Sequence, residues 1–300
     1  MAYCGAPLRY RGQRRLIYPE VLTIECSSVT VMEETEAVVG HYESIREELR
    51  IADGFGQLEL IRTREILHRH LPPPPCRVLD VGGGTGVHAE WLLDEGYQVH
   101  LVDITPRHVA IVQTELGAKG ITAEVGDART LTQGDGAFDV VLLLGPLYHL
   151  TARADRVRAF AEGARVARPG GVVVAAAISR FASLFDGLSR GFLIDSRFKQ
   201  IVQRDLVDGQ HRNPTNEPEW FTTAYFHQPD ELRQEAEDGG LGVVALLGVE
   251  GLAGWLTSLA PAWSTADGRE AILYAARATE SEDSLRGLSS HMLIVTQVPG

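Results

Sequence analysis

The sequence predicts an α/β fold built on a doubly wound sheet, and three observations indicate this class. Apolar runs of strand length alternate with amphipathic helical segments from residue 77 onward, as in right-handed βαβ units. The run 138–144, "FDVVLLL", is dominated by apolar and β-branched residues, which is typical of a parallel strand buried on both faces. A glycine-rich turn joins the first strand to the first helix of this alternation, and open α/β sheets bind ligands at such strand ends.

The chain before this alternation divides into two parts. Residues 1–32 contain a cluster of arginines and no helical period, so we expect a mobile extension there. Two helical segments, 34–52 and 56–71, follow and end at four consecutive prolines, 72–75, which cannot continue a helix. We therefore assign residues 33–75 to an N-terminal helical cap.

The remaining elements follow in order and define one domain, residues 76–300. Its first predicted strands are Arg77–Val81, Gln98–Val102, Thr122–Val125, 138–144 and Val172–Ile178, with helices 85–95, 107–117 and 152–167 between them. The last of these helices has apolar residues spaced three, four and seven apart, which gives it one core-facing side. The alternation breaks over residues 180–228 and resumes with helix 230–238, strand 243–249, a helix within 267–279 and strand His291–Val298. We interpret 180–228 as a helical lid inserted after the fifth strand, at the carboxyl edge of the sheet.

Composition and charge exclude several classes of partner. The formal net charge is −12 at pH 7, and an acidic surface repels nucleic-acid phosphates and anionic membranes, so we expect neither as a partner. No stretch approaches the roughly eighteen apolar residues of a membrane span, and no secretory signal pattern is present. The three cysteines are scattered, which fits a reducing cytoplasm and gives neither disulfide framework nor zinc site. His68 and His70 have no metal-binding spacing with any acid, so we predict no metal.

The glycine-rich turn lies within "VLDVGGGTGVHAEWL", residues 78–92. Its pattern is G-x-G-x-G, formed by Gly82, Gly84 and Gly86, and Val87 stands where a dinucleotide-binding loop has its third glycine. The G-K-[ST] signature of a phosphate-binding loop is also missing from it. Asp80 closes the strand before the turn; its carboxylate would repel a pyrophosphate and attract an ammonium group.

These residues carry a resemblance to a known family. "LDVGGGTG" resembles the first motif, D/E-x-G-x-G-x-G, of the class I S-adenosylmethionine-dependent methyltransferases, and "VHLVDITP", "VGDAR", "FDVVLLLGPLYHL" and "ARVARPGGVVVAA" resemble its later motifs in the same order. The similarity is dense over residues 76–178 and looser on either side. It implies a seven-stranded mixed sheet in the order 3-2-1-4-5-7-6 with the last strand antiparallel, and S-adenosylmethionine as the cofactor.

The resemblance also implies roles for individual residues. Asp103 would accept hydrogen bonds from both ribose hydroxyls, and Ile104 would pack on the adenine. Asp127 would accept from the adenine amino group, while the backbone of Ala128 meets a ring nitrogen. Gly145, in the fourth-strand motif, is also placed among the cofactor-binding residues.

The residue types of the motifs agree with the chemistry of this cofactor. It carries a sulfonium, an ammonium, a carboxylate and a ribose diol but no phosphate. Acids such as Asp80 at strand ends suit the ammonium and the diol, and the glycines allow close backbone approach. The first N–H groups of helix 85–95 can face the carboxylate.

Two residues of the N-terminal cap are further candidates for cofactor contacts. Arg62 is a candidate partner of the cofactor's carboxylate; the alternative is an ordinary solvated helix arginine. Tyr42 corresponds to an aromatic residue that closes over the cofactor in many family members, and the alternative is a core position on an amphipathic helix.

Tyr148 and His149 follow the fourth strand, where the family places residues facing the transferred methyl group. His149 is the first candidate for a general base, with Tyr148 orienting the acceptor or lining its pocket. The alternative is that His149 caps the next helix or packs structurally.

The insertion is unusually dense in polar and aromatic residues, namely Arg180, His211, Asn213, Trp220, Phe221, Tyr225 and His227. We expect Trp220–His227 to wall an acceptor pocket; the alternative is a surface subdomain with its own core. Near-helical spacing assigns a second set to that small core, namely Phe185, Leu188, Phe192, Phe198 and Ile201.

The sequence therefore favours methyl transfer to a small-molecule acceptor, through a nitrogen, oxygen or carbon nucleophile. The N-P-P-[YFW] signature of amino-group methylation on bases and glutamine is absent, because the fourth strand ends in "GPLY". A cofactor-binding protein of the same fold without methyl transfer is the second hypothesis, and a nicotinamide-dependent oxidoreductase is the third. The acceptor and the oligomeric state are not readable from the sequence.

Overall fold

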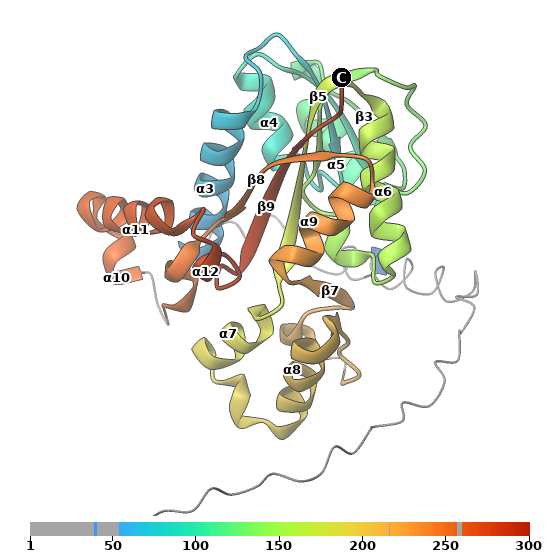
Figure 1. Ribbon diagram of the computed structural model, residues 1–300. Helices are drawn as coiled ribbons and strands as arrows, with labels where there is room; N and C mark the ends of the chain where they lie inside the picture. Colours follow the sequence, from blue (N-terminus) through green and yellow to red (C-terminus); the bar gives the residue numbers. More distant parts are fainter. Residues whose placement is uncertain (1–38, 41–53, 216, 257–259) are drawn as a thin grey trace, which may run out of the picture.

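The computed structural model describes residues 39–40, 54–215, 217–256 and 260–300 (Figure 1). The predicted extension and Tyr42 lie outside the described residues. The helices are α3 (Gly54–His70), α4 (Val87–Asp94), α5 (Pro106–Leu116), α6 (Arg153–Val166), α7 (Ala182–Ser189), α8 (Ser196–Asp208), α9 (Pro229–Asp238), α10 (Ala260–Trp263), α11 (Ala266–Thr279) and α12 (Asp283–Arg286). The strands are β1 (Arg77–Val81), β2 (Gln98–Asp103), β3 (Thr122–Val125), β4 (Phe138–Leu143), β5 (Ala167–Ser179), β6 (Gln210–His211), β7 (Ala224–His227), β8 (Gly242–Gly248) and β9 (His291–Gln297).

The sheet confirms the predicted order. Five parallel strands lie side by side in the order β3, β2, β1, β4, β5. Strand β9 then pairs antiparallel with β5, and β8 pairs antiparallel with β9. β9 and β8 thus take the places expected of the seventh and sixth strands. The short strands β6 and β7, which the sequence did not predict, are added at the end of β5, where Ile178 pairs with both Phe226 and His291.

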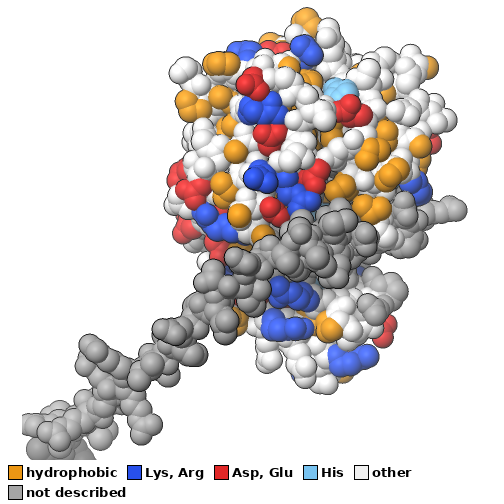
Figure 2. All heavy atoms as spheres, turned by 90° about the vertical axis from the view of Figure 1, so that its right-hand side faces the viewer, with side chains coloured by type: hydrophobic (Ala, Val, Ile, Leu, Met, Phe, Trp, Pro, Cys, Tyr) orange, Lys and Arg blue, Asp and Glu red, His pale blue; other side chains and the backbone are white. Residues whose placement is uncertain are grey.

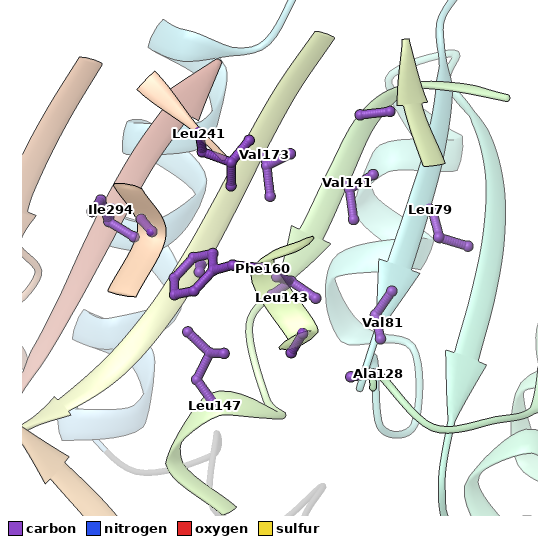
Figure 3. Close-up of a cluster of buried hydrophobic side chains, with 14 of the residues drawn as sticks. Leu79, Val81, Ala128, Val141, Leu143, Leu147, Phe160, Val173, Leu241 and Ile294 are labelled. Atoms are coloured by element: carbon purple, nitrogen blue, oxygen red, sulfur yellow. The ribbon is translucent and has the colours of Figure 1, made fainter. Parts of the chain in front are cut away.

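Alternate residues of the central strands pack on opposite faces of the sheet. Val78 and Val140 belong to the core beneath α3, α4 and α5, whereas Leu79 and Val141 belong to the core beneath α6 and α9. Figure 3 shows the second of these cores, with Phe160 of α6 at its centre. Burial on both faces explains why these strands are so apolar.

The insertion forms a separate lobe beyond the carboxyl end of β5, with α7 and α8 packed together (Figure 1). Its own small core contains Phe198, Ile201, Val202 and Trp220, with Phe192 half-buried against them. Phe185 is buried as predicted, but Leu188 is 59% exposed. Across the face shown in Figure 2, acidic and basic side chains are interspersed over the larger lobe. Among the described residues no helix has the length and apolar character needed to cross a bilayer.

Candidate active site

A cavity at the carboxyl ends of β1 to β4 collects most of the residues that the sequence singles out. It forms where the loops after these strands meet, and α3 adds Glu59 to its wall. The sequence-predicted residues that line it are Asp80, Gly82, Gly84, Asp103, Ile104, Asp127, Ala128, Gly145, Tyr148 and His149.

The floor of the cavity is a surface of bare backbone. Gly82 and Gly84 have left-handed backbone, with φ of +70° and +56°, a conformation that glycine adopts without steric cost. Gly145 approaches from the loop after β4, and a Cβ built there would lie 2.6 Å from the carbonyl oxygen of Gly82. The two loops therefore meet backbone to backbone, which leaves room for a ligand to approach the main chain.

Gly86 has a different role from the predicted one. It precedes α4 with φ of +86° and is not among the described residues that line the cavity. A Cβ there would lie 2.9 Å from Cδ1 of Leu116 and 3.2 Å from Cγ2 of Val112, both on α5. Gly86 thus lets α4 pack closely on α5, and its assignment to cofactor contact is corrected to a packing role.

Asp80 is a buried carboxylate with no donor among the described residues. Its side chain is 1% exposed, and neither oxygen accepts a hydrogen bond from the part of the chain that the structure describes. Burial, together with the nearby Asp103 charge, raises the pKa of the Asp80 carboxyl from 3.8 to about 7. A buried polar group without a partner is costly, so this carboxylate is suited to a ligand that brings a cation or a donor into the cavity.

Asp103, the last residue of β2, fixes the glycine turn. Its Oδ2 accepts from the amide of Gly84 at 2.9 Å, and its Oδ1 accepts from the amide of Thr105 at 2.8 Å and lies 3.2 Å from Nδ1 of His108. Burial alone would raise the pKa of Asp103, but these hydrogen bonds and the His108 interaction lower it. Asp103 is therefore the ionised neighbour that disfavours ionisation of Asp80, and Ile104 continues the wall beside it.

The loop after β3 adds Asp127 and Ala128 to the wall. Nε of Arg129 lies 3.0 Å from each carboxylate oxygen of Asp127, and its NH1 lies 3.1 Å from Oδ2 of Asp155 on α6. Burial alone would raise the pKa of Asp127, but the Arg129 hydrogen bonds lower it. Asp127 is therefore ionised and already oriented, through a partner that the sequence reading missed.

The loop after β4 brings the two candidate catalytic residues into the cavity. Tyr148 and His149 lie on the short 3-10 helix η2 (Leu147–His149), with their ring centroids 4.7 Å apart. Phe221 of the insertion lies beyond His149, at 6.1 Å between ring centroids. The insertion thus meets the cavity at the ring of the proposed base.

Arg62 lies elsewhere, and its predicted cofactor contact is corrected. The side chain is fully buried, pairs with Glu65 and Glu280, and donates from Nε to the carbonyl of Val249 at 3.2 Å. It is not among the described residues that line the cavity. A buried charge needs partners, and the Arg62 guanidinium finds one in Glu280, so it joins α3 to the end of α11.

Most of the lid residues also face away from the cavity. Trp220 packs on Phe198 with ring centroids 5.2 Å apart, inside the insertion's own core. His211 is buried between Asp205 and the carbonyl of Trp220, at 2.8 Å from each. None of residues 220–227 is among the described residues that line the cavity, so the expectation that Trp220–His227 walls it is wrong. This segment instead supports the cavity from behind, because Phe221 lies near the His149 ring and Tyr148 packs against Ala224 and Phe226. The remaining polar residues of this set, Arg180, Asn213, Tyr225 and His227, form hydrogen bonds within the protein.

Several lining residues received no predicted site role from the sequence, namely Glu59, Thr85, His88, His108, Arg129, Thr151 and Asp155. Thr85, His88 and Arg129 lie within the quoted stretches of sequence, and the other four lie outside them. Glu59 also comes within 4.8 Å of Glu250 and His291, counted between possible metal-ligand atoms. Glu250 already accepts from the Ser289 hydroxyl at 2.8 Å and from the His291 amide at 2.9 Å. We assign no ion to this group.

The fold and the cavity define a Rossmann-like protein with a ligand site at the carboxyl edge of its sheet, and comparisons with known proteins show what the chain is similar to. Residues 78–171 match the family model described as a methyltransferase domain. Over this segment the chain is similar to the class I S-adenosylmethionine-dependent methyltransferases, a class whose cofactor is S-adenosylmethionine.

Individual relatives agree with this family at moderate similarity. The chain is 30% identical over 177 residues to a ubiquinone biosynthesis O-methyltransferase of Bordetella bronchiseptica. This match covers 58% of this chain and 65% of the relative, so the chain spans less than two thirds of that protein. The fold is shared with a methyltransferase from Methanosarcina mazei (TM-score 0.53, 18% identity, 78% of this chain and 97% of that one). It is also shared with the [4+2]-cyclase SpnF (TM-score 0.52, 18% identity, 80% and 81%).

Proposed function

We propose that this protein binds S-adenosylmethionine in the cavity and transfers its methyl group to a small-molecule acceptor. One observation carries the proposal: Asp80, a buried carboxylate that accepts no hydrogen bond from the described residues, lies beside a glycine turn of bare backbone. A ligand with an ammonium group and a slender amino-acid tail fits this combination. When bound, the cofactor supplies a methyl group already activated by a sulfonium charge.

The residues around the cavity divide the work of binding. Asp80 would hold the ammonium, and the ionised Asp103 would accept from the ribose hydroxyls, with Ile104 against the adenine. Asp127, oriented by Arg129, would accept from the adenine amino group near the backbone of Ala128. Charged hydrogen bonds of this kind contribute about 1–3 kcal/mol each.

Catalysis then consists of alignment and proton removal. Tyr148 and His149 would flank the acceptor so that its nucleophilic atom forms a bond to the methyl carbon as the carbon–sulfur bond breaks, in line. His149 would take the proton that an O–H or N–H acceptor loses. The acidic overall charge supports an acceptor that is not a nucleic acid, and a relative named for ubiquinone biosynthesis supports a small molecule.

A labelled-donor assay tests the proposal. Purified protein is incubated with S-adenosylmethionine carrying a labelled methyl group and with pools of phenols, amines and activated C–H acids. We expect labelled product, and we expect His149→Ala to lower kcat by a factor of about 10²–10⁴. His100→Ala, a histidine outside this cavity, is the matched control and should retain activity.

The second hypothesis is cofactor binding without methyl transfer. It is retained because a protein of the same fold is named as a cyclase. It predicts that S-adenosylhomocysteine and S-adenosylmethionine bind while no pool yields labelled product. The nicotinamide hypothesis predicts thermal stabilisation by NAD(H) and none by S-adenosylhomocysteine.

A further inference from the structure

A buried arginine on α6, Arg156, grips the loop that carries the two candidate catalytic residues. Its side chain is 2% exposed. NH1 donates to the carbonyl oxygens of Leu150 and Thr151, at 2.8 Å to each. Both carbonyls belong to the two residues immediately after His149, and both residues line the cavity. One guanidinium therefore binds the backbone that immediately follows His149.

The other donors of Arg156 are bound to a second buried charge. Nε lies 2.9 Å from Oε2 of Glu235 on α9, and NH2 lies 2.7 Å from Oε1 of the same carboxylate. Glu235 is 1% exposed, so the pair is shielded from water and rigid. Two parallel N–H···O bonds to a carboxylate also fix the plane of a guanidinium, which directs NH1 toward the loop.

The same pair reaches the strands that close the insertion. Nε2 of His227, at the end of β7, lies 3.1 Å from Oε2 of Glu235. The guanidinium carbon of Arg156 lies 3.5 Å from the centroid of the Tyr225 ring. In addition, Nε2 of Gln210 on β6 donates to the carbonyl of Thr151 at 3.0 Å. The loop is thus held from α6 on one side and from the insertion on the other.

We propose that Arg156 is a positioning residue that sets His149 and Tyr148 against the methyl group by holding the carbonyls of Leu150 and Thr151, and that the insertion shares this role through Gln210. The inference rests on the proposed function of the cavity. Arginine is required because one planar fork must serve a carboxylate and two carbonyls at once. Lysine keeps the charge but is a compact cation without this geometry.

The test compares variants at two positions on α6. Arg156→Lys removes the fork and keeps the charge. Arg153→Gln is the matched control, because Arg153 also joins α6 to α9, through Asp238, but it is exposed and does not touch the loop. The readouts are the S-adenosylhomocysteine Kd by calorimetry, kcat and KM for an acceptor found in the labelled-donor assay, and the His149 ring signal in NMR spectra of histidine-labelled protein. His149→Ala assigns that signal.

Arg156→Lys should leave the S-adenosylhomocysteine Kd within about twofold, shift the His149 signal and lower kcat by about tenfold to a hundredfold, the size expected for a misplacement near 1 Å. Arg153→Gln should change none of these. An Arg156→Lys protein that is folded, with the His149 signal and kcat of the wild type, would overturn the proposal.

If Arg156→Lys does not fold, the variant Gln210→Leu tests whether the loop after His149 must be held in place. It removes a half-buried donor to the Thr151 carbonyl and leaves the buried ion pair intact. We expect the His149 signal to shift and kcat to fall by a smaller factor; an unchanged signal and kcat would refute the positioning role. If the wild type binds S-adenosylhomocysteine but methylates no acceptor, the proposed function fails, while the His149 signal still decides whether Arg156 positions the loop.

Discussion

Replacing Asp80 with asparagine should stabilise the ligand-free protein, and the gain should grow with pH. The carboxyl has a pKa of 3.8 when solvated and about 7 in the fold. An acid whose folded pKa is raised opposes folding once it ionises, so the penalty is absent below pH 3.8 and complete above pH 7. This difference of about three pKa units corresponds to about 4 kcal/mol at pH 8, of which about 2 kcal/mol is already present near pH 5.5.

The assay is urea unfolding of wild type and Asp80→Asn across this pH range, without ligand. The free energy of unfolding of the variant should exceed that of the wild type by an amount that rises by about 2 kcal/mol from pH 5.5 to pH 8. A difference that is independent of pH, or that shrinks as pH rises, would refute the reasoning.

Asp139→Asn is a control of opposite sign. Asp139 accepts from the amide of Arg77 at 2.9 Å and from Nε of Arg168 at 2.7 Å, and the Arg77 hydrogen bond lowers its pKa. An acid with a lowered folded pKa stabilises the protein above its unfolded pKa and loses this contribution as pH falls through the folded value. Asp139→Asn should therefore destabilise the protein near pH 8 and do so less in acid.

Three further predictions concern ligand contact and packing. Arg62→Met should lower the free energy of unfolding by about 3–5 kcal/mol because it leaves Glu280 buried with fewer partners, yet it should leave the S-adenosylhomocysteine Kd of the folded protein unchanged. The control Arg69→Met removes a more exposed partner of the same Glu280 and should cost about 1 kcal/mol or less. A weakened Kd in Arg62→Met would return Arg62 to the ligand site. Gly86→Ala should destabilise the protein more than Gly120→Ala in thermal unfolding, since both have positive φ but only the first places a Cβ against α5, and equal losses would contradict the packing role. Asp103→Ala should weaken S-adenosylhomocysteine by about 1–3 kcal/mol in calorimetry, whereas an unchanged Kd would exclude the predicted ribose contact.

The fold was predictable because its signals are local. Each central strand is a short apolar run, and each is followed by a turn and an amphipathic helix, so the elements around Asp80, Asp103 and Asp127 could be placed from sequence alone. The strand ends then had to meet at one edge, because parallel strands share their direction. Among the strands of the described residues, β6 and β7 were missed, since their pairing depends on where the insertion folds back onto β5.

The errors came from side chains whose role depends on distant partners. Arg62 was assigned to a ligand, but it forms an ion pair with Glu280, which lies far along the chain. Gly86 fits the motif, but the close approach of Leu116 and Val112 is what requires a glycine at this position. The aromatic and polar residues of the insertion, such as Trp220 and His211, satisfy one another inside it. Composition indicates that such groups need partners, but it does not say which ones.

The most direct measurement is calorimetric titration of S-adenosylhomocysteine into wild type and Asp80→Asn at pH 6 and pH 7.5. If the ionised Asp80 carboxylate holds the ligand's ammonium, the wild-type affinity should rise several-fold between these pH values, as a carboxyl with a pKa of about 7 loses its proton. Asp80→Asn should bind more weakly, and its affinity should not rise with pH over this range. A wild type that binds equally at both pH values, or not at all, would contradict the assignment of this cavity.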